Sequence, residues 1–400
     1  MELSTLLTRF NEPETLKMAK LGRELKAQGI DLTDLSLGEP DFDTPDHIKD
    51  AAKKAIDDNY SHYTPVAGFL ELRQAVCTKL MRDNGLAYTP EQIVVSTGAK
   101  QSIANMVLAI VDKGDEVIIP TPYWVTYSEI VKLAGGTVKL VKTSQVNGYK
   151  ITATELEAAI TERTKLFMFS SPCNPTGALY NKEELAALAE IFRKHTQVFI
   201  MSDEIYEHIN FTGKHETIAQ FPFLKDRTIV INGLSKGFAM TGWRVGYIAA
   251  PLEIAKACDK IQGQFTSGPN SIAQRAAIAA LLGDLRPTYQ MVQKFKERRD
   301  KLMQLLKEIP GISCDTPPAA FYVFPDVKAY FGKTTPAGDK IVNADDLCMY
   351  FLHTAHVSVV TGKAFGESDC IRISFANSTE NLEKGLKKIK GALAGLQSQQ

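Results

Sequence analysis

The sequence predicts an α/β protein: a large domain with a mostly parallel sheet flanked by helices, and a smaller α+β domain after it. With 400 residues, the chain is too long for one small core. Short apolar segments alternate with amphipathic ones over about two hundred residues, as in a parallel sheet covered on both faces. After about residue 285 this alternation gives way to one long charged segment and shorter apolar runs. The predicted units are an N-terminal segment that packs with the small domain (1–45), the large domain (46–285) and the small domain (286–400).

Two helices of the large domain are expected before its first strand. One runs through Asp57, and Thr44 and Pro45 have the residue types of its N-cap and first turn. The other ends at Gly85, a residue type that is common just after a helix. Its buried face is indicated by apolar residues one turn apart, namely Leu72, Val76 and Leu80.

Seven short apolar segments are expected to be the buried strands of the sheet. Helices between them begin at recognisable caps, since Thr152 with Glu155 and Asn181 with Glu184 have the spacing of a capping box. The strands are predicted at residues 92–96, 116–120, 137–141, 165–170, 198–201, 228–231 and 245–249.

The small domain is expected to begin within the long charged helix, residues 286–308. Strands then follow at residues 321–324, 357–360 and 370–374, and the last helix spans 380–396. The first forty or so residues are expected to be helical or irregular.

Composition excludes several function classes. Forty-six basic and 46 acidic residues balance, so neither nucleic acid nor an anionic membrane is expected as a partner. The cysteines are scattered without a CxxC pair, which argues against a zinc site and a disulfide framework and favours a reducing compartment. No metal is expected. No apolar stretch approaches the ~20 residues that span a bilayer. The expectation is a cytoplasmic protein.

The candidate site residues follow the strands, because ligands of such sheets bind at the carboxyl ends of the strands. After the first strand, Gly98, Ala99 and Lys100 form a small-residue turn that opens a helix. Its free backbone N–H groups suit a phosphate. By itself this is a weak signal, because most such turns only connect elements.

Later strand ends carry groups with more specific chemistry. Asn174 is held in a proline-rich turn, and Asp203 directly follows a buried strand, where a carboxylate needs a cationic partner. Tyr206 lies three residues further on. Lys236 follows the next strand, and Arg244 comes soon after it. The structural alternatives are that Asn174 only satisfies backbone groups of its turn, that Asp203 caps a helix, and that Lys236 is a solvated surface charge.

Together these residues match pyridoxal phosphate (PLP). This cofactor has an aldehyde for a lysine, a ring nitrogen that pairs with a carboxylate, a phenolic oxygen and a phosphate. Lys236, Asp203, Asn174 with Tyr206, and the Gly98 turn with Arg244 supply one partner for each. Signatures of dinucleotide, nucleotide and zinc-protease sites are absent from the sequence.

At these residues the chain resembles the class I/II aminotransferases of PLP fold type I, and within them bacterial aspartate aminotransferases. The resemblance extends from about Gly38 to Asn377. The matching segments are Gly38-Glu39-Pro40-Asp41-Phe42, Tyr63-Thr64-Pro65-Val66-Ala67-Gly68, Pro122-Tyr123-Trp124, Asn174-Pro175-Thr176-Gly177, Ser202-Asp203-Glu204-Ile205-Tyr206, Ser235-Lys236, Gly242-Trp243-Arg244 and Ile371-Arg372-Ile373-Ser374.

The resemblance implies a role for each matched residue. Lys236 would hold PLP as a Schiff base, Asp203 would pair with the ring nitrogen, and Trp124 would stack on the ring. Asn174 and Tyr206 would contact the phenolic oxygen. The phosphate would be surrounded by Gly98, Ala99, Lys100, Ser235 and Arg244, with Tyr63 from the neighbouring subunit of a homodimer.

The resemblance also implies how the substrate is bound. Arg372 and Asn174 would hold its α-carboxylate, beside Trp124 and under the Gly38 backbone. Lys100 would either bind a distal carboxylate or neutralise the phosphate. Two departures affect the pocket's fine shape: Ala319-Ala320-Phe321 where the family often has Gly-Ala-Phe, and Thr361 where it often has Pro.

The expected activity is transfer of the amino group of aspartate to 2-oxoglutarate by a ping-pong Schiff-base mechanism. Lys236 would carry the proton from the substrate Cα, with its pKa lowered by Arg244 and the positive ring of the cofactor. The alternatives are transfer from aromatic amino acids or to prephenate, a PLP-dependent lyase or decarboxylase, and a non-catalytic PLP-binding regulator.

Overall fold

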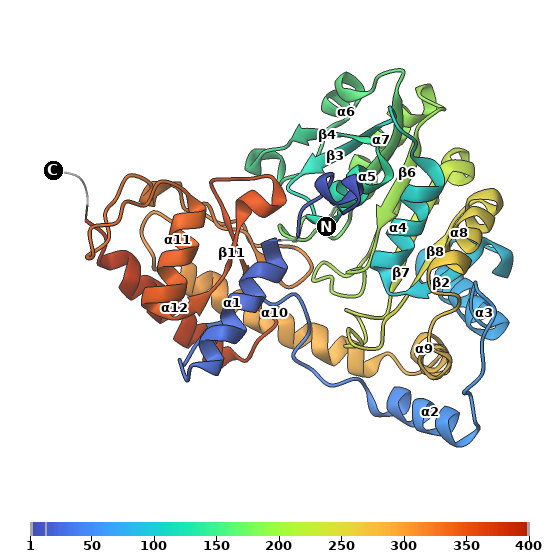
Figure 1. Ribbon diagram of the computed structural model, residues 1–400, viewed down its shortest axis with the longest axis horizontal. Helices are drawn as coiled ribbons and strands as arrows, with labels where there is room; N and C mark the ends of the chain where they lie inside the picture. Colours follow the sequence, from blue (N-terminus) through green and yellow to red (C-terminus); the bar gives the residue numbers. More distant parts are fainter. Residues whose placement is uncertain (1–2, 13, 398–400) are drawn as a thin grey trace.

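The computed structural model describes residues 3–12 and 14–397. The predicted units 1–45 and 286–400 thus include a few residues outside this description, namely 1, 2, 13 and 398–400. Figure 1 shows a larger lobe with the central sheet and a smaller lobe with the C-terminal elements, coloured orange to red. The long helix α10 (Arg286–Lys307) runs from the larger lobe to pack against α12 (Thr379–Ala394) in the smaller one.

The central sheet contains all seven predicted strands, in the order β2-β8-β7-β6-β5-β3-β4 within the described residues. Their neighbours pair in parallel, apart from β8, which is antiparallel to both β2 and β7. The prediction of a mostly parallel sheet is therefore confirmed. The strands are β2 (Ile93–Thr97), β3 (Glu116–Thr121), β4 (Thr137–Lys142), β5 (Thr164–Ser170), β6 (Phe199–Asp203), β7 (Thr228–Gly233) and β8 (Val245–Ala249).

The direction of β8 matters for the site. The parallel strands all end at one edge of the sheet, and β8 starts there because it runs the other way. Thr97, the last residue of β2, pairs with Val245, the first of β8. Arg244 therefore joins the strand-end residues although it precedes its strand.

Helices cover both faces of the sheet, because successive side chains of a strand point to opposite faces. On β5, Leu166 and Met168 pack into one apolar cluster, whereas Phe167 and Phe169 pack into another. The first cluster is covered by α4 (Ala99–Ile110), α5 (Thr126–Ala134) and α8 (Leu252–Phe265). The opposite face is covered by α2 (Asp46–Asp57), α3 (Leu70–Lys79), α6 (Ala153–Ala159), α7 (Lys182–Lys194) and α9 (Ser271–Leu282).

Most predicted helix ends are confirmed. The capping boxes of Thr152 and Asn181 are formed, and a π-helical turn after α3 ends at Gly85 in the left-handed conformation. The prediction for Thr44 is wrong, because α2 begins at Asp46 with Pro45 as N-cap. The Thr44 hydroxyl instead donates to the Ala239 carbonyl at 2.7 Å, which ties α2 to the loop after β7.

The smaller lobe contains an antiparallel sheet of β9 (Tyr322–Val323), β12 (Ile371–Ser374) and β11 (Val360–Thr361), with α11 (Ala344–Tyr350) beside it. The prediction of a single strand at residues 357–360 is wrong, because two separate strands lie there. The first of them, β10 (Val357–Ser358), pairs in parallel with β1 (Thr33–Asp34), and Val359 lies between β10 and β11. The N-terminal region thus holds a strand where helix or irregular chain was expected.

The N-terminal helix α1 (Glu14–Ala27) lies beside the smaller lobe in Figure 1. Met18 and Leu32 pack against Leu352 of that lobe. Before the helix, the Asn11 N–H donates to the Glu129 carboxylate on α5 at 2.6 Å, so this region also contacts the larger lobe. In the described part of the chain, no helix is both long and apolar enough to cross a membrane.

Candidate active site

A cavity of about 370 Å³ lies at the strand-end edge of the central sheet and is closed by residues of the smaller lobe. Most of the predicted site residues line it, although they come from distant parts of the sequence. They are Gly38, Ala99, Lys100, Trp124, Asn174, Asp203, Tyr206, Ser235, Lys236, Arg244 and Arg372.

Lys236 follows β7 and points its amine into the cavity. Its Nζ donates a hydrogen bond to the Gly38 carbonyl. Burial lowers the pKa of this amine to about 8, and the charges of Arg372 and Arg244 act in the same direction. Burial, rather than Arg244, is thus the main cause. At pH 7 about a tenth of the amine is neutral, far more than for an exposed lysine.

Asp203 ends β6 and is buried in the wall of the cavity. It accepts hydrogen bonds from the Tyr127 hydroxyl at 2.6 Å and from the Ile205 N–H at 3.1 Å. Burial raises its pKa to about 6, although both hydrogen bonds oppose the shift. A positive group in the cavity would favour its charged form.

Positive groups gather at the N-terminus of α4. Gly98 caps this helix at φ 81°, and a Cβ on it would collide with the Arg244 guanidinium. Lys100 lies in the first turn, with its Nζ 5.1 Å from the centre of the Trp124 ring. Burial lowers the pKa of Lys100, and Arg244 lowers it further. Free N–H groups, an arginine and a lysine together make an anion site.

Arg372, on β12, brings a buried cation from the smaller lobe. Its Nη1 donates to the Asn174 side-chain oxygen at 2.9 Å and its Nη2 to the Ser36 carbonyl at 2.7 Å. Its Nε has no partner among the described residues, and no carboxylate there forms an ion pair with it. Because an unpaired buried charge is costly, this guanidinium is prepared for an anionic ligand.

Two predicted residues do not line the cavity. Gly98 lies just behind Arg244, whose side chain needs the space that a Cβ would fill. Tyr63 is fully exposed, between α2 and α3. Its predicted role belongs to a neighbouring subunit, so it stays a prediction.

Sequence reasoning missed several residues of the cavity wall. Tyr127 lies one helical turn after Trp124, and this spacing could have indicated it. Ser36 lies two residues before Gly38, and this closeness in the sequence could have indicated it. Tyr322 directly follows the Ala319-Ala320-Phe321 departure. The other missed residues are Leu37, Ser170, Ile205 and Thr241.

The two departures from the family pattern lie in ordered local structure. Ala319, at the position where the family often has Gly, is fully buried and forms an isolated antiparallel bridge with Asn210. Thr361 caps a short 3₁₀ turn, with its hydroxyl accepting from the Lys363 N–H at 3.3 Å.

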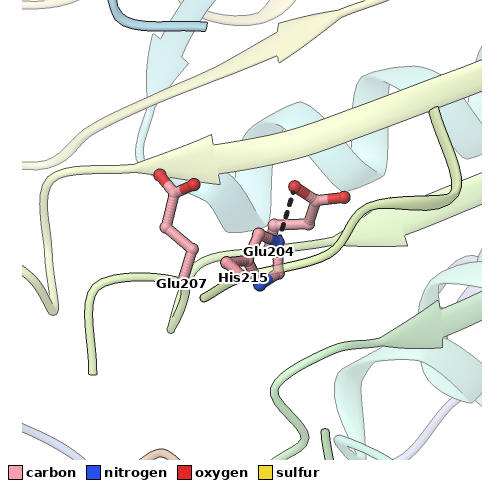
Figure 2. Close-up of side chains that lie close together, drawn as sticks. All are labelled: Glu204, Glu207 and His215. Carbon is pink, nitrogen blue, oxygen red and sulfur yellow. Dashed lines mark hydrogen bonds and ion pairs between the residues drawn. The ribbon is translucent and has the colours of Figure 1, made fainter. Parts of the chain in front are cut away.

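A second group of titratable side chains lies outside the cavity lining (Figure 2). Glu204, Glu207 and His215 place one ligand-type atom each within 4.8 Å of one another, with His215 turned toward Glu204 at 3.0 Å. The buried amine of Lys79 pairs with Glu207, to which the Asn232 amide also donates at 2.8 Å.

The two carboxylates of this group already have polar and cationic partners within the chain. Burial opposes ionisation of Glu207, but the charges of Lys79, His208 and His215 together outweigh it and lower the pKa of the carboxyl. Burial likewise opposes the charge on His215, but Glu204 raises its pKa overall. The group therefore fixes the turn after β6, which carries Tyr206 and directly follows Asp203.

Known proteins resemble this chain in sequence and fold. The model of the family described as aminotransferase class I and II matches residues 30–389. The aspartate/prephenate aminotransferase of Cereibacter sphaeroides is 48% identical over 396 residues, which cover 98% of this chain and 99% of that protein.

Solved structures agree over almost the full length. The aspartate aminotransferase from Rhizobium meliloti matches with a TM-score of 0.96 at 42% identity, covering 99% of this chain and 100% of that one. The enzyme from Thermus thermophilus, solved with maleate, matches with a TM-score of 0.92 at 38% identity, covering 98% and 100%.

Proposed function

Because the chain belongs to the class I and II aminotransferase family, we propose that it moves the amino group of aspartate to 2-oxoglutarate. Oxaloacetate and glutamate are the products, and the two half-reactions follow one another in a ping-pong order. One observation carries the proposal: a single cavity holds a lysine amine with lowered pKa, a buried carboxylate and a buried arginine without an anion.

The residues of the cavity fit pyridoxal phosphate. The amine of Lys236 suits its aldehyde, and buried Asp203 suits the ring nitrogen, whose positive charge would compensate the carboxylate. The N-terminus of α4 with Arg244 suits the phosphate. The Arg244 guanidinium approaches this turn so closely that a Cβ on Gly98 would collide with it. When bound, the cofactor supplies an aldehyde that takes up the amino group and a ring that accepts electrons from the substrate Cα.

The chain's own residues position the substrate and move its proton. Arg372 holds the α-carboxylate with two parallel N–H bonds, and Asn174 keeps the guanidinium in place. Lys236 takes the proton from the substrate Cα onto its Nζ and then releases it again within the same cavity. The lowered pKa of this amine favours both steps near neutral pH. Trp124 and Tyr127 form an edge-to-face pair at 5.6 Å that bounds the cavity beside Asp203.

Selectivity for a dicarboxylic substrate rests on Lys100. Its amine is partly buried near Arg244 and has no carboxylate partner among the described residues, so a second carboxylate would compensate it. The related Thermus thermophilus enzyme was solved with maleate, a dicarboxylate. Prephenate, which also has two carboxylates, is the second candidate, because the Cereibacter sphaeroides relative is named an aspartate/prephenate aminotransferase.

The test compares kcat/KM for aspartate, glutamate, phenylalanine and prephenate, in wild type and in Lys100→Gln. Aspartate is expected to be the best amino donor, and Lys100→Gln should lower its kcat/KM by about tenfold or more with less effect on phenylalanine, because one charge contact is lost. Lys113→Gln, an exposed lysine outside the cavity, is the control. Faster turnover of phenylalanine than of aspartate in wild type would overturn the assignment, as would formation of elimination products.

A homodimer is part of the proposal. Tyr63 is fully exposed and Phe265 is 70% exposed, and their segments adjoin, because a Cβ on Gly268 would collide with Thr64. Large exposed aromatic side chains of this kind favour an interface. Tyr63 would reach the phosphate of the neighbouring subunit. A cytoplasmic location remains the expectation drawn from the scattered cysteines.

A further inference from the structure

Tyr322 connects the two lobes inside the cavity. It lies on β9 of the smaller lobe and is fully buried, and its hydroxyl lies 2.8 Å from the Tyr206 hydroxyl of the larger lobe. The two rings meet edge to face, with centres 5.8 Å apart. The contact therefore depends on the placement of one lobe relative to the other.

The surroundings of Tyr322 are those of the reaction site. The Arg372 guanidinium lies 4.5 Å from the centre of the Tyr322 ring. A Cβ on Gly38 would lie 2.9 Å from the Tyr322 hydroxyl, so this glycine leaves room for it. The carbonyl of the same glycine accepts the hydrogen bond of Lys236. The hydroxyl is thus close to the groups proposed to bind and react.

The direction of the hydrogen bond between the two hydroxyls is open in the protein alone, since either oxygen can donate. Burial raises the pKa of Tyr206 and of Tyr322, so both keep their single proton in the working pH range. If Tyr206 donates that proton to an oxygen of a ligand, it can only accept from its neighbour. Tyr322 then becomes the donor, and the two bonds reinforce each other.

We propose that Tyr322 is a positioning residue that orients the Tyr206 hydroxyl toward the phenolic oxygen of the cofactor. The inference rests on the proposed function and deepens it. Through Tyr322, the placement of the smaller lobe adjusts how strongly Tyr206 donates. A stronger donor withdraws negative charge from the phenolic oxygen, and that charge helps to hold the proton that titrates on the bound cofactor.

The test is a pH titration of the visible absorption band of the cofactor-loaded protein. Tyr322→Phe keeps the ring but removes the hydroxyl, and should raise the apparent pKa of the band by about half a unit, because Tyr206 becomes a weaker donor. Tyr206→Phe should raise it more. In the Tyr206→Phe background, adding Tyr322→Phe should give no further rise, because its effect passes through Tyr206.

Tyr330→Phe is the matched control, since Tyr330 is another buried tyrosine of the smaller lobe whose hydroxyl bonds a carbonyl away from the cavity. It should leave the titration unchanged. An equal rise from Tyr322→Phe with and without the Tyr206 hydroxyl would overturn the proposal, as would no rise in either background. Wild-type protein that binds no chromophore would instead contradict the proposed function.

Discussion

At the scale of single residues, the cavity holds charges that the fold leaves without full compensation. Asp203 is buried with neutral hydrogen-bond donors, and Arg372 is buried with a carbonyl and an amide as its partners. Such buried charges lower the stability of the fold unless a ligand of opposite charge pairs with them. They are also the groups that a cofactor and an amino acid would complete, so a loss of stability and a gain in binding have the same origin.

Asp203→Asn is expected to stabilise the cofactor-free protein. The folded carboxyl has a pKa of about 6 against an ordinary value of 3.8, so between these values the folded state binds more protons than the unfolded one. Stability therefore falls as pH rises through this window, and the full loss applies above pH 6. Asn should recover about 1–3 kcal/mol at pH 7.5 and almost nothing at pH 3.5.

Urea denaturation of the cofactor-free variants at the two pH values measures this effect, and cofactor affinity measured on the same samples should fall. The control is Asp226→Asn, which changes an exposed carboxylate and should alter neither quantity. An Asp203→Asn protein that is less stable than wild type at pH 7.5, or that keeps full cofactor affinity, would contradict this account.

At the scale of elements, the sequence was sufficient where a local pattern decides the outcome. The seven apolar strands, the capping boxes of Thr152 and Asn181 and the glycine end at Gly85 all depend on neighbouring residues. The antiparallel direction of β8 depends on its pairing with β2 and β7, which no local pattern reveals. Thr44 failed as a cap because a tertiary partner, the Ala239 carbonyl, takes its hydroxyl.

The candidate site could be predicted to a similar extent. Residues that follow strands were found, because the carboxyl ends of parallel strands share one edge. Arg372 was identified through family resemblance alone, since it lies within β12 of the other lobe. Tyr127 and Tyr322 were missed because their hydroxyls reach the site from helix α5 and from the smaller lobe, not from a strand end of the central sheet.

The ion pair between Lys79 and Glu207 is predicted to hold α3 to the turn after β6. Lys79→Met would leave a buried carboxylate without its cation, which should cost about 3–5 kcal/mol of unfolding free energy. Denaturant unfolding measures the loss. The double variant Lys79→Met/Glu207→Gln should recover part of it, because the unpaired charge is gone.

Lys53→Met is the matched control for this pair. Lys53 forms an exposed ion pair with Asp50 on α2, and its loss should cost less than about 1 kcal/mol. If Lys79→Met proved as mild as the control, the buried pair would not support the turn that follows Asp203 and carries Tyr206.

At the scale of the whole molecule, the cavity exists only because two lobes meet over it. Arg372 contacts Asn174, and Tyr322 contacts Tyr206, so each pair joins the smaller lobe to the larger one. The segment around Gly38 completes the cover and receives the hydrogen bond of Lys236. Substrate binding at Arg372 is therefore linked to the relative position of the lobes.

A second subunit is predicted to complete the site by contributing Tyr63. Sedimentation velocity should give a dimer, and Tyr63→Phe should speed release of the cofactor by about tenfold without changing the dimer, because one phosphate contact is lost. Tyr289→Phe, at another exposed tyrosine, should change neither property. A monomer with full cofactor retention would rule out the shared site.

The most direct measurement concerns the bond at Lys236. Borohydride converts a carbon–nitrogen double bond between a lysine and an aldehyde into a permanent single bond, which peptide mass spectrometry can locate. We expect coloured protein that the reagent bleaches, with the cofactor's mass on the peptide that contains Lys236 and no label in Lys236→Ala. Colourless protein after incubation with pyridoxal phosphate, or a label on another lysine, would contradict it.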